Sequence, residues 1–393
     1  MRAGETFDAV VVGGGLLGMA TAYHLVSAGA RALLVDRADM GRATDAGAGI
    51  LSPETNSRDP EAWYFLAMES VEYYPTLVER LRSEQPGDPG YARCGKLVVA
   101  VSSDEVEAFV QARRIVFERQ RRAGRPRPDA LREISSAEAR ELFPPLATAH
   151  GAIYSRDAAR VDGRLLNRAL RAAAEARGLV VREGSVEGLV LEGGAVKGVT
   201  VGGQTIGTGA VAIAGGAWSD AFARQLGVAI PVAPQRGQII HLGLGGTDTS
   251  QWPMVNAFHH HYLVAWPDSR VVAGATRETG SGFVPRTTAA GVREVLDEAL
   301  RVAPGLARAE IREIRVGLRP LTVDTLPVLG PVPDVRGVFL NTGHGPTGLT
   351  LGPLSGRIVA DQMLGKPVTT EVAAFSIARF GAHTGARDPH ADG

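Results

Sequence analysis

The spacing of apolar residues along the chain predicts short buried strands that alternate with amphipathic helices. Residues 8–12, DAVVV, form a short apolar run typical of a central parallel strand. Residues 16–29, LLGMATAYHLVSAG, carry apolar side chains at helical spacing, and Gly29 ends that helix. A second apolar run, ALLVD, ends at Asp36. This succession of strand, helix and strand predicts an α/β fold that begins with a βαβ unit.

The middle of the chain predicts a change to antiparallel sheet. Residues 162–178 predict a helix that Asp162 caps and Gly178 ends. Short strands joined by glycine turns follow and indicate a small antiparallel meander that returns to the first domain: LVVREGSV, EGLVLEGG, AVKGVTVGG and AVAIAGGAW. Further strands are expected near 90–145 and 230–316, in a second domain: KLVVAV, GQIIHL, HYLVAWP and RVVAGAT. The chain is therefore expected to pass between two domains more than once.

The first glycine-rich turn has the pattern of a dinucleotide-binding site. Gly13, Gly15 and Gly18 follow the first strand, and Asp36 ends the next strand about 20 residues later. Gly13 permits the tight turn, Gly15 lets the backbone approach a pyrophosphate, and Gly18 lets the helix pack on the strand. The free N–H groups at the helix start attract phosphate, and Asp36 would accept hydrogen bonds from a ribose. A glycine turn that binds nothing is the alternative.

A second glycine run, NTGHGPTGLTLGPLSG at 341–356, repeats the spacing but not the surroundings. A strand and a helix can form around it, yet no buried strand ending in an acid follows, and Asp361 falls within the helix. We therefore expect no second nucleotide-binding unit. The helix start can instead face an electron-rich group at the far end of the first cofactor.

Composition narrows the class of protein. The chain has 393 residues, long enough for two domains, with 45% hydrophobic and 21% charged residues. Acidic and basic residues balance at 42 each, so we expect neither a nucleic acid nor an acidic membrane surface as partner. Cys94 is the single cysteine, and no apolar run reaches the ~18 residues of a membrane span. A cytoplasmic enzyme is the expectation.

Several motifs occur in order along nearly the whole chain: VVVGGGLLG…LLVDR, GRATDAGAGIL, VDGRLLNRAL, AIAGGAWSD, PQRGQII, YLVAWPDSRVVAGAT, GLRPLTVDTLPVLGP and NTGHGPTGLTLGPLSG. In this order they resemble the flavin-dependent D-amino acid oxidase family and, within it, the glycine oxidase branch. The resemblance implies FAD as the cofactor. Because no cysteine lies in the matched flavin-facing segments, the FAD is expected to be bound non-covalently.

The resemblance also implies the domain organisation. It predicts an α/β protein, α+β overall, with a Rossmann-like FAD-binding domain built from residues 1–88, 150–228 and 317–382. A substrate-binding domain with a large mixed antiparallel sheet is expected from residues 89–149 and 229–316. Residues 383–393 are predicted to be a disordered tail.

Cofactor contacts follow from the resemblance position by position. The pyrophosphate is expected against Gly13, Gly15, Leu16, Leu17 and Gly18. The adenosine ribose is expected on Asp36 with Arg37 beside it, and the adenine at the backbone of Val186. A second phosphate segment and a stretch along the flavin are assigned to Ala43, Thr44, Ala48, Gly49 and Ile50. The loop and helix start under the flavin ring are assigned to His344, Gly345, Pro346, Thr347, Gly348, Leu349 and Thr350.

Asp45 departs from the family pattern, which has a small hydroxyl residue there. A carboxylate near phosphates would be repulsive, so we expect the Asp45 side chain to point away, as a helix N-cap. Trp218, in GGAWSD, is expected to pack beneath the cofactor domain.

Arg319, in GLRP, is the candidate for binding the substrate, because the family anchors an amino acid carboxylate at this position. A guanidinium offers two parallel N–H bonds to a carboxylate, although a structural ion pair with Asp324 is the alternative. The run HHHY at 259–262 does not predict a metal site, because adjacent side chains of a strand point to opposite faces. His260 and Tyr262 match cavity-facing positions. Tyr262 could donate a hydrogen bond to the carboxylate, and His260 could form a hydrogen bond with the amine or shape the cavity.

The resemblance predicts oxidation of a C–N bond in an amino acid or secondary amine, with O₂ or another acceptor receiving the electrons. Glycine oxidase has an aromatic residue and an arginine where this chain has Gly345 and Pro346, so we expect a wider cavity that accepts a substrate larger than glycine. The alternatives are a D-amino acid dehydrogenase that feeds a quinone, an NAD-linked reductase, and a flavin-binding subunit that is inactive alone. A homo-oligomer is left open.

Overall fold

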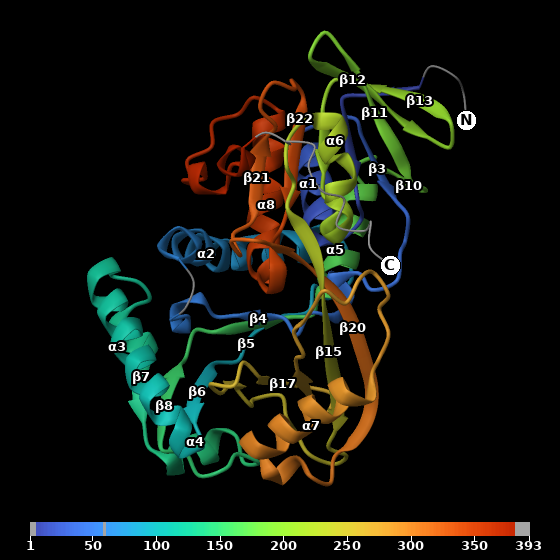
Figure 1. Cartoon of the computed structure of the whole chain (residues 1–393). Coiled ribbons are helices and arrows are strands. Elements are labelled where there is room, and N and C mark those ends of the chain that lie inside the picture. Colours follow the sequence, from blue (N-terminus) through green and yellow to red (C-terminus); the bar gives the residue numbers. More distant parts are fainter. Residues whose placement is uncertain (1–4, 58–59, 382–393) are drawn as a thin grey trace.

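The computed structural model describes residues 5–57 and 60–381, and a six-stranded sheet forms one half of it (Figure 1). The strand order is β10 (Val180–Glu183), β3 (Ala32–Asp36), β2 (Ala9–Val12), β14 (Val211–Ile213), β22 (Val338–Thr342), β21 (Val328–Pro331). Every neighbouring pair is parallel except β21 with β22. The carboxyl ends of β2, β14 and β22 therefore meet at one edge, which brings the two glycine runs together.

Helices cover one face of this sheet. They are α1 (Leu16–Ser27), α2 (Glu61–Glu84), α5 (Gly163–Glu175) and α8 (Gly348–Met363), and their apolar sides form one large core with the sheet. The Asp162 carboxylate accepts hydrogen bonds from the backbone N–H groups of Arg164 and Leu165, which confirms the predicted cap of α5.

The opposite face carries a second core beneath a four-stranded sheet, in the order β1 (Thr6–Phe7), β13 (Gln204–Thr208), β12 (Ala195–Val201), β11 (Val186–Glu192). Strands β11, β12 and β13 form the antiparallel meander predicted from the glycine turns. The short helices η5 (Gly216–Phe222) and α6 (Ala223–Leu226) follow β14 and complete this side.

A nine-stranded mixed sheet forms the other half (Figure 1). Its order is β19 (Glu278–Thr279), β15 (Val232–Gly243), β18 (Arg270–Gly274), β17 (Tyr262–Trp266), β16 (Met254–Asn256), β6 (Lys96–Ala100), β8 (Gly151–Ser155), β7 (Leu131–Ile134), with β20 (Glu310–Thr322) beside β15. All four strands expected for the second domain belong to it. Helices α3 (Val106–Ala123), α4 (Ser136–Leu142) and α7 (Ala289–Val302) pack against it.

Two connections join the halves. The long antiparallel pair β15 and β20 runs up towards the six-stranded sheet (Figure 1). A small sheet of β4 (Ile50–Leu51), β9 (Ala159–Val161) and β5 (Tyr91–Arg93) also lies between the halves (Figure 1). The division into two domains with the boundaries above stays a prediction, and the expected tail at 383–393 lies outside the described residues. Within residues 5–57 and 60–381, no helix combines the length and apolar character that crossing a membrane requires.

Candidate functional site

Two adjoining cavities open where the carboxyl edge of the six-stranded sheet meets the nine-stranded sheet. The first, here the glycine-turn cavity, is lined by residues 12–17, 35–37, 39, 42–44, 184–187, 214–218, 221, 222, 318 and 320. The second, here the arginine cavity, is lined by residues 16, 17, 43, 44, 46–50, 237, 262, 277, 317, 319, 320, 344–346, 348 and 349. Five residues line both, so the two cavities are continuous: Leu16, Leu17, Ala43, Thr44 and Pro320.

The first glycine turn holds the start of α1 against the sheet. Gly13 has a φ of 104°, and a Cβ on it would lie 2.4 Å from the carbonyl oxygen of Ala214. A Cβ on Gly18 would lie 1.9 Å from the carbonyl oxygen of Gly13, so only glycine lets the helix approach its strand this closely. Gly18 does not line either cavity. Its contact with the strand gives it a packing role, and the expected pyrophosphate contact stays a prediction.

Asp36 ends β3 at the wall of the glycine-turn cavity, where a ribose is expected. Its carboxylate forms an ion pair with Arg42, with 2.5 Å between Oδ2 and the guanidinium nitrogen. Arg42 also lines the cavity, and the sequence did not indicate it. The carboxylate is thus fixed at the edge of the cavity, ready to accept hydrogen bonds from a diol.

Thr44 connects the two segments that are expected to face the phosphates. Its buried hydroxyl accepts a hydrogen bond of 3.0 Å from the backbone N–H of Leu16, at the start of α1. Ala43 and Thr44 belong to η1 (Ala43–Ala46), and both line both cavities. Asp45 lines neither cavity, as expected, but its side chain caps no helix. The N-cap expectation is wrong because Arg42 occupies the cap of η1 and Asp162 that of α5.

The far wall of the glycine-turn cavity comes from segments that sequence reasoning largely missed. Val186 lines it as expected, together with Gly184, Ser185 and Glu187. Trp218, expected to pack beneath the domain, also lines it, and the guanidinium of Arg37 lies 5.5 Å from the centre of its ring. A signal was present: GGAW follows a central parallel strand, and loops at that position line ligand crevices in α/β sheets.

The second glycine run forms the wall of the arginine cavity. Gly345 and Pro346, in η7 (Gly345–Thr347), and Gly348 and Leu349, at the start of α8, line it. The positive end of the α8 dipole therefore faces the cavity. Thr347 and Thr350 do not line it.

Both threonine hydroxyls bond to the protein, and the expected cofactor contacts of Thr347 and Thr350 stay predictions. The Thr347 hydroxyl donates to the carbonyl of His344 and lies 3.3 Å from the indole nitrogen of Trp63. The Thr350 hydroxyl donates to the carbonyl of Ile50. Both therefore tie the α8 start to its neighbours.

His344 is buried at the base of this wall. Its Nδ1 lies 3.0 Å from the carbonyl oxygen of Thr342 and its Nε2 3.0 Å from the hydroxyl of Ser355. Burial lowers the pKa of its imidazole to about 3. The ring is therefore neutral at physiological pH and holds the loop in place, with both nitrogens engaged.

Arg319 and Tyr262 meet across four strands of the nine-stranded sheet. They stand on β20 and β17, with β15 and β18 between. A Cβ on Gly237 of β15 would lie 2.4 Å from Nη2 of Arg319, and one on Gly274 of β18 would lie 2.7 Å from the hydroxyl of Tyr262. The middle strands thus present glycines, and the two long side chains lie over them.

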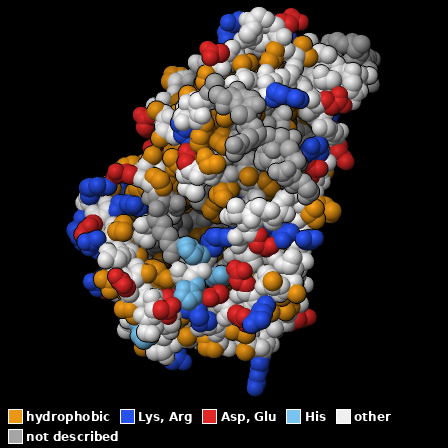
Figure 2. Space-filling model, viewed as in Figure 1, with side chains coloured by type: hydrophobic (Ala, Val, Ile, Leu, Met, Phe, Trp, Pro, Cys, Tyr) orange, Lys and Arg blue, Asp and Glu red, His pale blue; other side chains and the backbone are white. Residues whose placement is uncertain are grey.

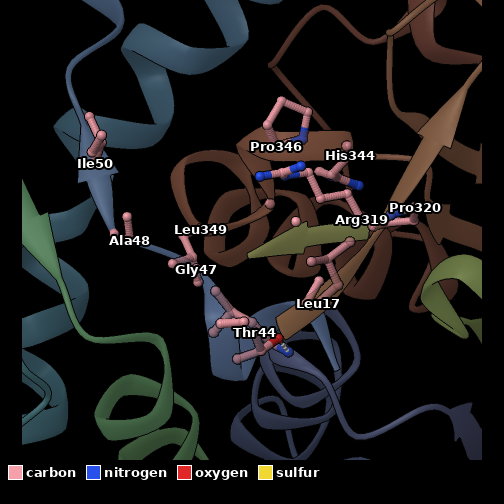
Figure 3. Close-up of a pocket in the computed structure, with 18 of the residues that line it drawn as sticks. Leu17, Thr44, Gly47, Ala48, Ile50, Arg319, Pro320, His344, Pro346 and Leu349 are labelled. Atoms are coloured by element: carbon pink, nitrogen blue, oxygen red, sulfur yellow. Dashed lines mark hydrogen bonds between the residues drawn. The ribbon is translucent and has the colours of Figure 1, made fainter. Parts of the chain in front are cut away.

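The guanidinium of Arg319 is fixed by hydrogen bonds from Nη1 to the carbonyl of Thr276, at 2.9 Å, and to Oε1 of Gln235, at 3.3 Å. It shares one side of the cavity with His344 and Pro346, while Ala48 and Ile50 lie at the other (Figure 3). Asp324, the alternative partner, pairs instead with Arg379. Arg319 therefore faces the cavity as a candidate carboxylate ligand.

Tyr262 is a hydrogen-bond donor in this setting. Burial raises the pKa of its phenol, and the positive charges of Arg319 and Arg277 oppose that rise. The hydroxyl therefore stays protonated at neutral pH, next to the cation that would hold a carboxylate.

His260 does not share the position of Tyr262. The predicted strand begins only at Tyr262, and residues 258–260 form the turn between β16 and β17, where His260 has a φ of 67° and is exposed. Its side chain is not part of the cavity wall. The expectation that His260 and Tyr262 share a strand face is wrong, because a turn does not keep the alternation of a strand.

Together the cavities fit a flavin dinucleotide. The glycine turn packs the start of α1 closely on its strand, Asp36 stands where a ribose is expected, and the α8 start would face the ring system. Ala48, Gly49 and Ile50 provide the remaining wall beside it. Arg319 lies across the cavity from this stretch (Figure 3).

Comparisons with known proteins agree with this geometry. A family model described as "FAD dependent oxidoreductase" matches residues 8–362. The chain is 38% identical to the crystal structure of iminodiacetate oxidase from Chelativorans sp. BNC1, with a TM-score of 0.88 over 94% of this chain and 98% of that one. Glycine oxidase of Pseudomonas aeruginosa is 33% identical over 371 residues, 93% of this chain and 97% of that protein.

The crystal structure of glycine oxidase from Geobacillus kaustophilus is 29% identical, with a TM-score of 0.86 over 95% of this chain and 99% of that one. These similarities confirm the predicted fold class and the resemblance to the glycine oxidase branch. They also confirm FAD as the cofactor and the class of enzyme. The chain belongs to the FAD dependent oxidoreductase family.

Proposed function

We propose that this protein is an oxidase that removes two electrons from the C–N bond of a glycine-like amine: glycine, an N-substituted glycine or a D-amino acid. FAD, when bound, would supply the acceptor for the hydride that leaves the substrate carbon, at flavin N5. The substrate is thereby converted to an imine, which water hydrolyses, and O₂ receives the electrons to give H₂O₂. The observation that carries the proposal is the guanidinium of Arg319, which lines the same cavity as the α8 start.

Arg319 and Tyr262 bind and orient the substrate. The bonds to Thr276 and Gln235 fix the angle of the guanidinium, so a carboxylate that docks on it is held at a set position and angle. The phenol of Tyr262 can donate a further hydrogen bond to the same carboxylate. Holding the substrate in this orientation is the main contribution of the protein's side chains to the reaction rate.

The described cavity wall holds no base for the substrate amine. Of the titratable side chains that line it, Arg319 and Arg277 are cations, Tyr262 is protonated and His344 is neutral with both ring nitrogens engaged. The amine must therefore lose its proton to solvent before the C–H bond breaks, so we expect the rate to rise with pH.

The shape of the wall supports an N-substituted substrate. Gly345 and Pro346 stand where the glycine oxidase branch has an aromatic residue and an arginine, and both line the cavity. The similar structure from Chelativorans is an iminodiacetate oxidase, and iminodiacetate is an N-substituted glycine. Comparing glycine with N-alkylglycines tests this part, and a clear preference for free glycine would refute it.

Arg319→Ala tests the proposal. The variant loses a bidentate, charge-assisted contact, so KM should rise roughly 100-fold. The flavin should stay bound, because Arg319 stands at the reacting end, and the flavin absorbance of the purified variant measures this. Arg379→Ala, which breaks the ion pair with Asp324 outside the cavity, is the matched control. An unchanged KM in Arg319→Ala would remove Arg319 from its role.

The electron acceptor needs its own measurement. A D-amino acid dehydrogenase that passes electrons to a quinone is the alternative, since the loop GHGPTG is also compatible with that branch. Release of H₂O₂ in step with substrate turnover under air supports the oxidase. Turnover that requires a quinone and releases no peroxide supports the dehydrogenase.

A further inference from the structure

We propose that Tyr74 is a positioning residue for the cofactor, because its hydroxyl replaces a backbone hydrogen bond that Pro353 removes from the start of α8. The inference rests on FAD as the cofactor and on the expectation that the α8 start faces the flavin ring, and it does not depend on the identity of the substrate. Tyr74 lies on α2, 275 residues before Leu349, and no motif of the sequence points to it. In the proposal, Tyr74 fixes the carbonyl of Leu349 and, through it, the first turn of α8.

The first turn of α8 lacks one of its own hydrogen bonds. Pro353 lies inside the helix and has no backbone N–H. In a regular α-helix this N–H would donate to the carbonyl four residues earlier, which is that of Leu349. An unpaired carbonyl inside a protein costs free energy, so the Leu349 carbonyl needs a donor from another element.

Tyr74 supplies this donor. Helix α2 crosses α8 (Figure 1), and the phenol hydroxyl of Tyr74 donates a hydrogen bond to the carbonyl of Leu349. The side chain is fully buried, and its ring stacks on that of Tyr91, with 5.7 Å between the ring centres. Burial raises the pKa of the Tyr74 phenol well above its ordinary value, so the hydroxyl keeps its proton and remains a donor.

The turn that Tyr74 holds is packed into the wall of the arginine cavity. Leu349 lines that wall, and a Cβ on Gly47 would lie 2.5 Å from its Cδ1. The Thr350 hydroxyl donates to the carbonyl of Ile50, on the same wall. A displaced first turn would therefore shift two things: the positive end of the α8 dipole and the stretch 47–50 beside it.

The midpoint potential of the bound flavin reports this position. The positive end of a helix dipole stabilises negative charge on the reduced ring, so a displaced α8 start should lower the potential. Tyr74→Phe changes no charge. Acidic and basic side chains balance at 42 each and are intermixed on the face shown in Figure 2, so the potential should respond to the local change. We expect the equilibrium constant for flavin reduction to fall about threefold, which is about 14 mV for a two-electron couple.

A double-mutant cycle tests the mechanism on purified holoprotein without substrate. Pro353→Ala returns an N–H that can donate to the Leu349 carbonyl from within α8. Tyr74→Phe should therefore shift the potential in the wild-type background and leave it nearly unchanged in the Pro353→Ala background. Tyr73→Phe is the matched control on the same helix, because the Tyr73 hydroxyl lies 3.1 Å from Nε2 of His24, on α1, and it should keep the wild-type potential.

Each outcome decides for or against the role of Tyr74. A shift in Tyr74→Phe that disappears in the double variant supports the proposal. An unchanged potential in Tyr74→Phe, an equal shift in both backgrounds, or the same shift in Tyr73→Phe overturns it. If Tyr74→Phe purifies without flavin, Pro353→Ala should restore flavin binding to it, and a double variant that stays empty also overturns the proposal. A bound flavin that no glycine-like amine reduces would refute the proposed oxidase and leave the role of Tyr74 standing.

Discussion

The glycine-turn cavity and the arginine cavity adjoin, but they are built in different ways. The first is lined mainly by loops that follow β2, β3 and β14, neighbouring strands whose carboxyl ends meet at one edge. The second takes its polar side chains from β17, β20 and the segment after β18, which antiparallel pairing brings into one row. We call the glycine-turn cavity the nucleotide end and the arginine cavity the reacting end, after the part of the ligand proposed for each. Close backbone approach makes the first, and side chains that cross a sheet make the second.

The difference determines which changes each end tolerates. At the nucleotide end, backbone atoms lie against the glycines, so these atoms cannot move aside for an added methyl group. At the reacting end a side chain can be removed while its strand stays paired. Substitutions at the first end should therefore remove the cofactor, and substitutions at the second should change substrate use with the flavin retained.

Gly18→Ala should have the largest effect. The new Cβ would lie 1.9 Å from the carbonyl oxygen of Gly13, and neither backbone segment can give way without moving α1 off its strand. We expect a loss of stability of about 1–3 kcal/mol or more and loss of most of the bound flavin. Thermal unfolding and the flavin-to-protein absorbance ratio measure both.

Gly209→Ala provides the matched control, because a Cβ there meets nothing within 4 Å. It should keep its flavin and its melting temperature. A Gly18→Ala protein with full flavin content would show that the nucleotide end is not held by close backbone packing, and the contrast between the two ends would disappear.

The same contrast explains how much could be predicted from the sequence. Gly13, Gly18 and Asp36 belong to one local pattern, and the residues expected beside them lie along the cavity with Gly18 as the exception. Arg277 could not be found this way. Its place in the cavity depends on the register of β17, β18 and β20, which no local spacing encodes.

The turn at 258–260 shows a related limit. HHHY continues an apolar strand pattern, so it predicted a strand across His260. The chain instead turns before Tyr262. In this turn the His259 ring contacts two acids, with 2.9 Å to Asp104 and 3.1 Å to Glu298. Those partners are distant in sequence, so the spacing of the three histidines could not reveal them.

Asp36→Asn should have an intermediate effect at the nucleotide end. It removes the charge that pairs with Arg42 and weakens the hydrogen bonds expected to a ribose, so the Kd of FAD should rise about tenfold. With saturating FAD, kcat should match wild type, because Asp36 lies in the other cavity from Arg319.

Titration of apoprotein with FAD, followed by fluorescence, measures the affinity. Asp39→Asn is the control, because Asp39 lines the same cavity but its ion pair with Arg37 is exposed, and a change within twofold is expected. Equal losses in both variants would indicate that overall negative charge, and not the position of Asp36, matters there.

The smallest effect is expected at Tyr262, where pH gives the readout. Burial raises the phenol pKa above the ordinary value of tyrosine, so the donor form persists up to about pH 10 and the rate should only rise as the substrate amine loses its proton. Tyr262→Phe removes one neutral hydrogen bond of about 1 kcal/mol, so kcat/KM should fall about fivefold at every pH.

The shape of the pH profile should not change in Tyr262→Phe. Tyr154→Phe, whose ring is outside the cavity, should match wild type. A falling limb below pH 10 that vanishes in Tyr262→Phe would mean that the two arginines, not burial, set this pKa, and the reacting end would then be governed by charge more than by enclosure.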